Sequence, residues 1–483
     1  MVSPSFLGFV LLAVALFASG CGDEHSPAMG TTSGGGSAGA PDVALAGRAG
    51  DAGRGSDDDA GAGEPGLPLG GAGGVPATSP ERHLSTPAEL SARSAHGYEN
   101  NESGLIHPDT LSRWLSDWAS ERPRGIEGDL VILQLGAAQT ALPYAPSHEG
   151  VRTYLANDLP ALMEVRLNGV TAIGRSPARG VKVDSYLRRY GIDPARDFVL
   201  LASGSAQPGA LSALARAWLP LRYWGFAHEN LGLLQGSVVA GLPDEKRVAT
   251  ALEPASDGAA RVPSLGRDHF SLLANVGSVR LAVATELPLL DVRSEDAFDG
   301  RVLSESASDD TCLDGPPLCT AIRGGRIPSS LHLPIGQLLT ADGARLLPLD
   351  ELDGALSSAG LGPHDEVVVY DDDGDKSAIA TFALLAVAGV PARWYASSFV
   401  EWASLNASHP EPALRALPTD SPWRTDTAGE SEVWAELGRG IRPLIVDPYA
   451  ASSDAVTSTD RAYLESPPPL PGLGDGGSEC AAP

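Results

Sequence analysis

The middle of the chain alternates apolar runs with helical stretches, and this alternation constrains the fold more than any other feature of the sequence. "DLVILQL" (129–135) and "FVLLA" (198–202) are apolar runs of strand length. Stretches with helical spacing, such as "VDSYLRRYGI" and "GALSALARAWLPLRYWG", lie between and after them. Buried strands that alternate with helices are typical of α/β proteins. The pattern predicts parallel sheets flanked by helices.

The same pattern occurs twice along the chain. A second strand is expected at Leu287–Val292, a helix should end near Gly360, and "DEVVVYDDDGDKSAIATFALLAVAGV" reads as strand, loop and helix. In each copy a short loop joins a buried strand to a long apolar helix. Ligands of open α/β sheets bind at the carboxyl ends of strands. We therefore predict two domains, residues 101–260 and 261–410, with a candidate site in the loop of each.

The second of these loops, which we call the aspartate loop, has an unusual charge. It consists of Asp371, Asp372, Asp373, Gly374, Asp375, Lys376 and Ser377. Helix N-termini favour anions, yet two unit charges about 4 Å apart repel by roughly 4 kcal/mol at a surface-like dielectric, and this loop offers an incoming anion four carboxylates. We interpret the acids mainly as structural, because Asp is a strong N-cap and is stabilised in a first helical turn.

Two functional interpretations of the loop stay open. Asp371, Asp373 and Asp375 alternate as the oxygen ligands of calcium loops do, although Gly374 precedes the third acid and no Glu occupies the twelfth position. Alternatively, Asp371 could act as a nucleophile or an acid–base group in some transfer reaction.

Four motifs of the second half resemble successive landmarks of the rhodanese (sulfurtransferase) domain. They are "LLDVRSEDAF", "RGGRIPSSLHLPIGQLL", "VVVYDDDG" and "WYASSFVEWA". The first half resembles the family more faintly, through "YGIDPARDFVLLASG" and "LLQGS". The resemblance implies a tandem rhodanese, with a divergent first domain and the site in the second.

The resemblance also implies a reaction. In the family, a cysteine follows the strand that ends in Tyr, and its thiolate carries a sulfane sulfur taken from a donor such as thiosulfate. Here that position is Asp371, and Ala202 takes the matching place in the first repeat. A carboxylate forms no persulfide. We expect a degenerate site without sulfurtransferase activity and without a cofactor, in a module that binds or scaffolds an unknown protein or small molecule. The alternatives are an active sulfurtransferase (thiosulfate or 3-mercaptopyruvate type) and a calcium-binding loop.

Other residues of the second repeat are expected to be structural. His332 should pack rather than catalyse, and Asp291 and Arg293 should form an ion pair near the loops. Trp394, Tyr395, Phe399 and Trp402 have the spacing of core residues.

The N-terminus resembles a bacterial lipoprotein signal. Phe6–Ala18 is apolar but short for a bilayer span, and "ASGC" then leads to Cys21. We expect residues 1–21 to be the signal, with lipidation on Cys21. Residues 22–100 form a low-complexity Gly/Ala/Ser/Pro linker that should be disordered. The chain would be an exported, membrane-anchored lipoprotein of the cell envelope, facing the periplasm or the exterior. Its net charge of −27 disfavours nucleic acid as a partner.

The remaining cysteines and the C-terminus give weaker signals. Cys312 and Cys319 bracket the turn-forming "LDGPPL", so a local disulfide is plausible in an oxidising compartment, and Cys480 is left over. Residues 411–483 should form a mostly irregular extension, in which 432–450 resembles the start of a third unit or an added edge strand.

Overall fold

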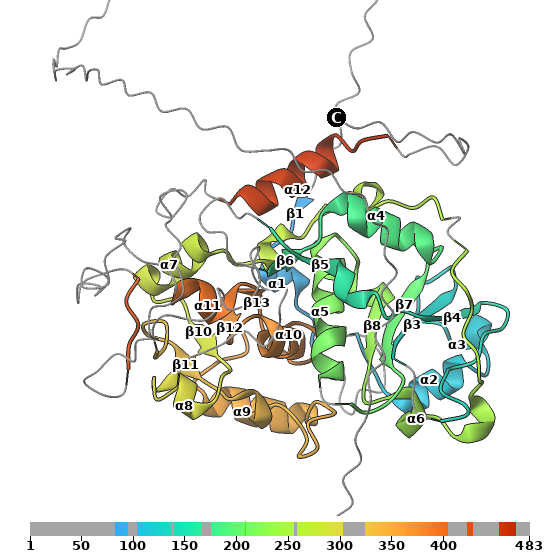
Figure 1. The fold of residues 1–483 in the computed structure, drawn as a ribbon, viewed down its shortest axis with the longest axis horizontal. Coiled ribbons are helices and arrows are strands. Elements are labelled where there is room, and N and C mark those ends of the chain that lie inside the picture. Colours follow the sequence, from blue (N-terminus) through green and yellow to red (C-terminus); the bar gives the residue numbers. More distant parts are fainter. Residues whose placement is uncertain are drawn as a thin grey trace, which may run out of the picture. The chain divides into compact units, whose positions relative to one another are not determined.

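Two parallel sheets, each covered by helices on both faces, form the framework of the protein (Figure 1). The computed structural model describes residues 83–94, 104–136, 140–166, 175–207, 209–255, 258–302, 324–403, 423–427 and 454–469. The predicted α/β class is confirmed. Within these residues, no helix is both long and apolar enough to cross a membrane.

The first domain is built on a five-stranded sheet with the order β2-β8-β7-β3-β4. Its strands are β2 (Leu105–Ile106), β3 (Leu130–Leu135), β4 (Val151–Leu155), β7 (Phe198–Ser203) and β8 (Leu231–Leu234). The run at 130–133 is fully buried, as expected for a parallel strand covered on both faces. Helices α2 (Pro108–Trp114), α3 (Trp118–Glu121) and α6 (Val238–Gly241) cover one face, and α4 (Gly180–Arg189) and α5 (Ala210–Tyr223) cover the other.

The second domain is built on a four-stranded parallel sheet with the order β11-β10-β12-β13. The strands are β10 (Leu289–Asp291), β11 (Leu331–His332), β12 (Val367–Tyr370) and β13 (Ala392–Trp394). One face is covered by α9 (Leu349–Ser358) and α10 (Asp375–Phe382), and the other by α7 (Val276–Thr285) and α11 (Ser398–Trp402). The short helix α8 (Glu295–Phe298) follows β10.

The strand orders of the two sheets confirm the tandem repeat. In the first domain β4-β3-β7-β8 has the same sequence-to-space order as β11-β10-β12-β13 in the second. Strands β7 and β12 are therefore equivalent, and each leads into the long helix of its repeat, α5 or α10.

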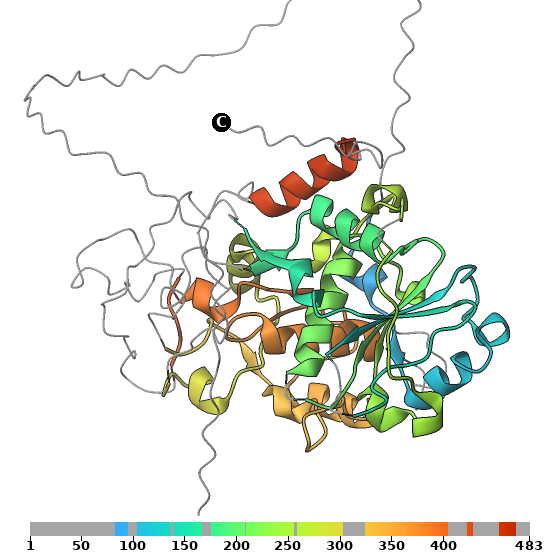
Figure 2. The same ribbon diagram turned by 45° about the vertical axis from the view of Figure 1, so that its right-hand side comes forward.

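The helices α5 and α10 lie side by side between the two sheets, as both ribbon views show (Figures 1 and 2). The rings of Trp218 and Phe382 form an edge-to-face contact with a centroid separation of 5.0 Å. One hydrophobic cluster includes buried residues of both helices, so the two domains share a core.

The expected linker 22–100 is wrong at its C-terminal end. Residues 83–94 hold β1 (His83–Leu84), which pairs with β9 (Arg267–Asp268), and α1 (Pro87–Leu90), which has a capping box. The amides of Ala92 and Ser94 donate to the carbonyls of Leu385 and Val387. Tertiary contacts, including a hydrogen bond from Arg222 of the first domain to the carbonyl of Leu90, add to the local capping box.

The expected irregular extension 411–483 also needs correction. Residues 423–427 lie on the second domain, where the backbones of Asp426 and Arg326 exchange two hydrogen bonds. Helix α12 (Ala455–Glu465) packs near α4 of the first domain. Residues 432–450 lie outside the described part of the chain, as do Cys21, Cys312, Cys319 and Cys480.

Candidate functional site

The aspartate loop leaves the carboxyl end of the buried strand β12 and enters α10 at Asp375. The turn depends on Gly374, whose φ is +97°. A Cβ there would lie 2.3 Å from the carbonyl oxygen of Ala396, so a side chain has no room. This tight turn directs the amides at the start of α10 back toward the end of β12.

The side chain of Asp371 accepts four hydrogen bonds, and these donors form what we call the donor set. The Gly374 amide donates to Oδ1 and the Lys376 amide to Oδ2, both at 2.7 Å. The hydroxyls of Ser377 and Ser398 lie 2.7 Å and 2.8 Å from Oδ1. Amides at a helix N-terminus and hydroxyls are the groups that stabilise an anion. The carboxylate of Asp371 thus fills an anion site made by its own loop.

Two residues beyond the loop position these hydroxyls. The indole N–H of Trp394 donates to Ser377 Oγ at 3.0 Å, which leaves the Ser377 hydroxyl hydrogen for Asp371. Ser398 has a φ of +54°, in the left-handed region that a serine rarely adopts. Trp394, at the end of β13, and Ser398, at the start of α11, both belong to the motif "WYASSFVEWA". They therefore contribute to the site as well as to the hydrophobic core.

Asp371 is completely buried. Burial, together with the nearby carboxylates of Asp373 and Asp372, raises its pKa to about 6, while the hydrogen bond from Ser377 acts in the opposite direction. The acid remains mostly ionised at neutral pH. No atom of it is exposed to a substrate, and the interpretation of Asp371 as a nucleophile has no support in this geometry.

The other acids of the loop have separate environments. Asp372 pairs with Lys376 at 3.0 Å. Burial alone would lower the pKa of Lys376, but Asp372 raises it. Asp373 is buried. Asp375 points away from this group: its Oδ1 lies 2.6 Å from Nη1 of Arg175 and 2.6 Å from Nη1 of Arg216.

The two arginines come from the first domain and were missed by the reasoning from sequence. Arg175 lies on β6 (Arg175–Pro177), which pairs with β5 (Met163–Val165), and Arg216 lies on α5. The one available signal was the spacing of Ser212 and Arg216, four residues apart, which places a polar strip on an otherwise apolar helix.

The calcium hypothesis gains no support. Among the described residues, no group of three His, Cys, Asp or Glu side chains is placed to hold a metal ion. Asp371 is surrounded by N–H and O–H donors, and Asp375 by guanidinium groups. The donors engage the oxygen atoms of Asp371 that a cation would need, and the guanidinium groups at Asp375 repel a cation.

The matching loop of the first repeat starts later than predicted. Ala202 lies inside β7, where it pairs with Gln134, so the prediction that Ala202 takes the place matching Asp371 is wrong. The carbonyl of Gly204 accepts from the Val239 amide, as the carbonyl of Asp371 accepts from the Phe399 amide. Gly204 is the structural counterpart and has no side chain to offer.

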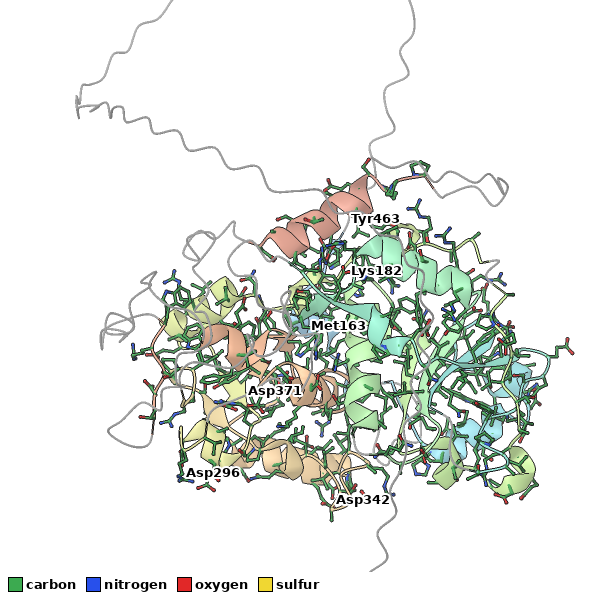
Figure 3. All side chains as sticks on the ribbon, in the orientation of Figure 1. Met163, Lys182, Asp296, Asp342, Asp371 and Tyr463 are labelled. Atoms are coloured by element: carbon green, nitrogen blue, oxygen red, sulfur yellow. The ribbon has the colours of Figure 1, made fainter. Side chains whose placement is uncertain are left out.

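The residues expected to be structural have structural contacts. His332 stacks on Phe298 with ring centroids 4.2 Å apart, and its Nε2 lies 3.1 Å from the carbonyl oxygen of Arg293. Asp291 and Arg293 form a fully buried ion pair. The four predicted aromatic core residues are buried: Trp394, Tyr395, Phe399 and Trp402. Figure 3 labels Asp371, beside the helix that Figure 1 labels α10.

Comparisons with known proteins agree with this architecture. The Rhodanese-like domain family matches residues 276–405. A protein of Haloferax volcanii, provisionally named a thiosulfate sulfurtransferase, is 28% identical over 194 residues, which are 38% of this chain and 61% of that protein. The chain thus spans less than two thirds of this relative. SseA of Mycobacterium bovis, whose name carries the same provisional activity, is 25% identical over 287 residues, 58% of this chain and 87% of that protein.

Solved structures with a similar fold include SseA from Escherichia coli, described as a 3-mercaptopyruvate sulfotransferase. It is 20% identical, and the match covers 62% of this chain and 99% of that chain with a TM-score of 0.41.

Proposed function

The chain belongs to the rhodanese family, and on that premise we propose that it is a member without sulfurtransferase activity that serves as a binding or scaffold protein. The observation that carries the proposal is the state of Asp371. A carboxylate occupies the position where the resemblance implies a persulfide cysteine, and it takes the hydrogen bonds of the donor set.

Three physical reasons support the loss of activity. Oxygen cannot take over the role of a thiolate, because it forms no persulfide with a sulfane sulfur. The donor set that would stabilise a sulfur anion is engaged by Asp371. The carboxylate of Asp371 already holds a negative charge in this site, and a second anion about 4 Å away would be repelled by roughly 4 kcal/mol at a surface-like dielectric.

We further propose that the protein is exported and held at a membrane by a lipid on Cys21. The apolar run at 6–18 and the small residues before the cysteine support this. The polar, Gly-rich residues that follow would let the folded domains lie away from the membrane.

The competing function is an active sulfurtransferase that uses one of the cysteines outside the described residues. The provisional names of the two curated relatives are consistent with that activity. The two functions differ in one measurable quantity, which is transfer of sulfur to an acceptor.

The test is thiocyanate formation from thiosulfate and cyanide by the purified full-length chain. We expect no turnover above the rate without protein. Asp371→Cys puts a thiolate into the donor set and should gain turnover only where this buried position opens to thiosulfate, while Asp371→Ser, which has no thiol, should stay silent. Adding Asp372→Asn removes one acid near the site and should raise any turnover that Asp371→Cys shows.

Turnover by the unaltered chain would overturn the proposal. The same assay with 3-mercaptopyruvate in place of thiosulfate tests the second sulfur donor. Turnover by the unaltered chain with this donor would also overturn the proposal. If turnover is seen and disappears in Cys312→Ser, Cys319→Ser or Cys480→Ser, the active thiol is identified as well.

A further inference from the structure

We propose that the aspartate loop has become the docking site for the first domain of the same chain. The contact consists of Asp375 in the loop and Arg175, Ser212 and Arg216 in the first domain, and we call it the interdomain latch. The inference rests on the proposed function, because it assigns to a non-catalytic loop the partner that it binds.

The geometry of the latch is specific. One carboxylate oxygen, Asp375 Oδ1, lies 2.6 Å from Nη1 of both Arg175 and Arg216. The hydroxyl of Ser212 donates to the backbone carbonyl of Asp375 at 2.9 Å. Three side chains from two elements of the first domain thus meet at one residue of the second.

The latch is largely shielded from water. The Arg175 side chain is completely buried, that of Arg216 is 14% exposed and that of Asp375 is 29% exposed. Charge-assisted hydrogen bonds of this length, with limited exposure, are stronger than surface ion pairs. Removal of the Asp375 carboxylate would leave the buried guanidinium of Arg175 and the nearly buried guanidinium of Arg216 beside each other without this negative charge. The loss of one member of a buried ion pair lowers the free energy of unfolding.

The charges of the loop explain why Asp375 is the residue that reaches the first domain. Asp371 turns inward to the donor set, and Asp372 pairs with Lys376 inside the loop. Asp375 stands at the first position of α10, where that helix lies against α5. The positive charges of Arg175 and Arg216 then offset part of the negative charge of the aspartate loop.

The latch fixes the relative orientation of two domains whose interface is otherwise apolar. The α5–α10 contact includes Trp218 and Phe382, and apolar packing of this kind has little directionality. Paired charges and hydrogen bonds fix orientation and register. The latch therefore makes the two domains one cooperative body, with the loop closed by its neighbour.

The experiment is denaturant unfolding of the full-length chain, followed by tryptophan fluorescence and far-UV circular dichroism. The unaltered chain should unfold in a single transition seen by both probes. Asp375→Asn and Arg216→Met should each lower the midpoint and split the transition in two. The double variant should show a shift no larger than the greater of the two single shifts, because the two residues form one contact.

The matched control is Asp372→Asn, which removes an acid of the same loop whose ion pair lies within the loop. It should keep the single transition. If a single variant does not fold, the charges are exchanged instead. Asp375→Arg lowers the denaturant concentration at the unfolding midpoint, and adding Arg216→Asp should recover at least half of that decrease.

Equal midpoints and equally shaped transitions for Asp375→Asn and Asp372→Asn would overturn the latch, as would no recovery in the charge-exchanged protein. These results are independent of sulfur transfer. A chain that turns over thiosulfate would contradict the proposed function and leave the unfolding criterion unchanged.

Discussion

At the scale of single residues, the side chain of Asp371 fills an anion site that its own loop and the neighbouring residues form. The turn at Gly374, the hydroxyls of Ser377 and Ser398 and the indole of Trp394 together concentrate donors on one point. Such an arrangement stabilises any anion of suitable size. Because the anion here is covalently part of the loop and completely buried, the site is occupied permanently.

The pH dependence of stability should report this burial. The pKa of Asp371 is about 6 in the folded protein, above its ordinary value of 3.8, so the proton binds more tightly to the folded state. The contribution of this group to stability is full below about pH 3.8 and is lost as the pH rises through 6. Relative to Asp371→Asn, which does not titrate, the unaltered protein should lose up to about 3 kcal/mol of unfolding free energy between pH 4 and pH 7.5.

Urea denaturation of both proteins across this pH range measures the difference, and all other titrating groups cancel to first order. A difference that stays constant with pH would show that Asp371 titrates normally, and that the donor set offsets the cost of its burial.

At the scale of elements, α12 is attached to the first domain by buried polar contacts. Arg166 donates two hydrogen bonds of 2.8 Å to the two carboxylate oxygens of Asp460, and the Tyr223 hydroxyl donates to the same carboxylate at 2.7 Å. Tyr463 lies against Gly180, where a Cβ would come within 2.3 Å of its ring. Figure 3 labels Tyr463 on this helix. The C-terminal region is thus part of the fold.

Loss of this attachment should be costly. Asp460→Ala would leave Arg166, which is 4% exposed, without the carboxylate that pairs with it, and we expect a loss of about 3 to 5 kcal/mol in unfolding free energy. Arg461 also forms an ion pair, with Asp268 at 2.9 Å, but its side chain is 45% exposed. Arg461→Met is therefore the control and should cost less than about 1 kcal/mol.

Equilibrium unfolding in urea gives both values. If the two variants lose the same stability, α12 is held by its apolar contacts rather than by the buried pair.

At the scale of the whole molecule, two folded domains follow a long polar segment that begins at a candidate lipid site. Beyond that segment, residues 83–94 and 423–427 lie on the second domain, and α12 lies on the first. Segments from both ends of the described part of the chain are thus packed on the two domains.

The proposed lipid anchor on Cys21 can be tested directly in a bacterium that processes lipoproteins. The full-length chain should incorporate an alkyne-labelled fatty acid and sediment with membranes, because a thioether-linked lipid on Cys21 inserts its acyl chains into the bilayer. Cys21→Ala should incorporate no label and should not sediment. An unlabelled wild-type chain would refute the lipid anchor without affecting the folded domains.

The sequence by itself predicted the α/β class and the tandem repeat, and its resemblance to the rhodanese family placed Asp371 where a cysteine is expected. These features depend on local information: apolar runs of strand length, helical spacing and the identity of one residue after a strand. The predicted ion pair of Asp291 and Arg293 belongs to the same group, because its members are only two positions apart in the sequence.

Only the tertiary structure decided which residues complete the site and which terminal segments fold. Arg216 meets Asp375 from a distance of 159 residues, and Asp460 meets Arg166 from 294 residues away. Ala202 does not match Asp371 because the ends of strands are poorly marked in sequence, and only the pairing of β7 with β3 shows that the strand continues to Ser203. Contacts between distant residues depend on how the two sheets and their helices pack. Local patterns in the sequence do not specify which distant elements meet.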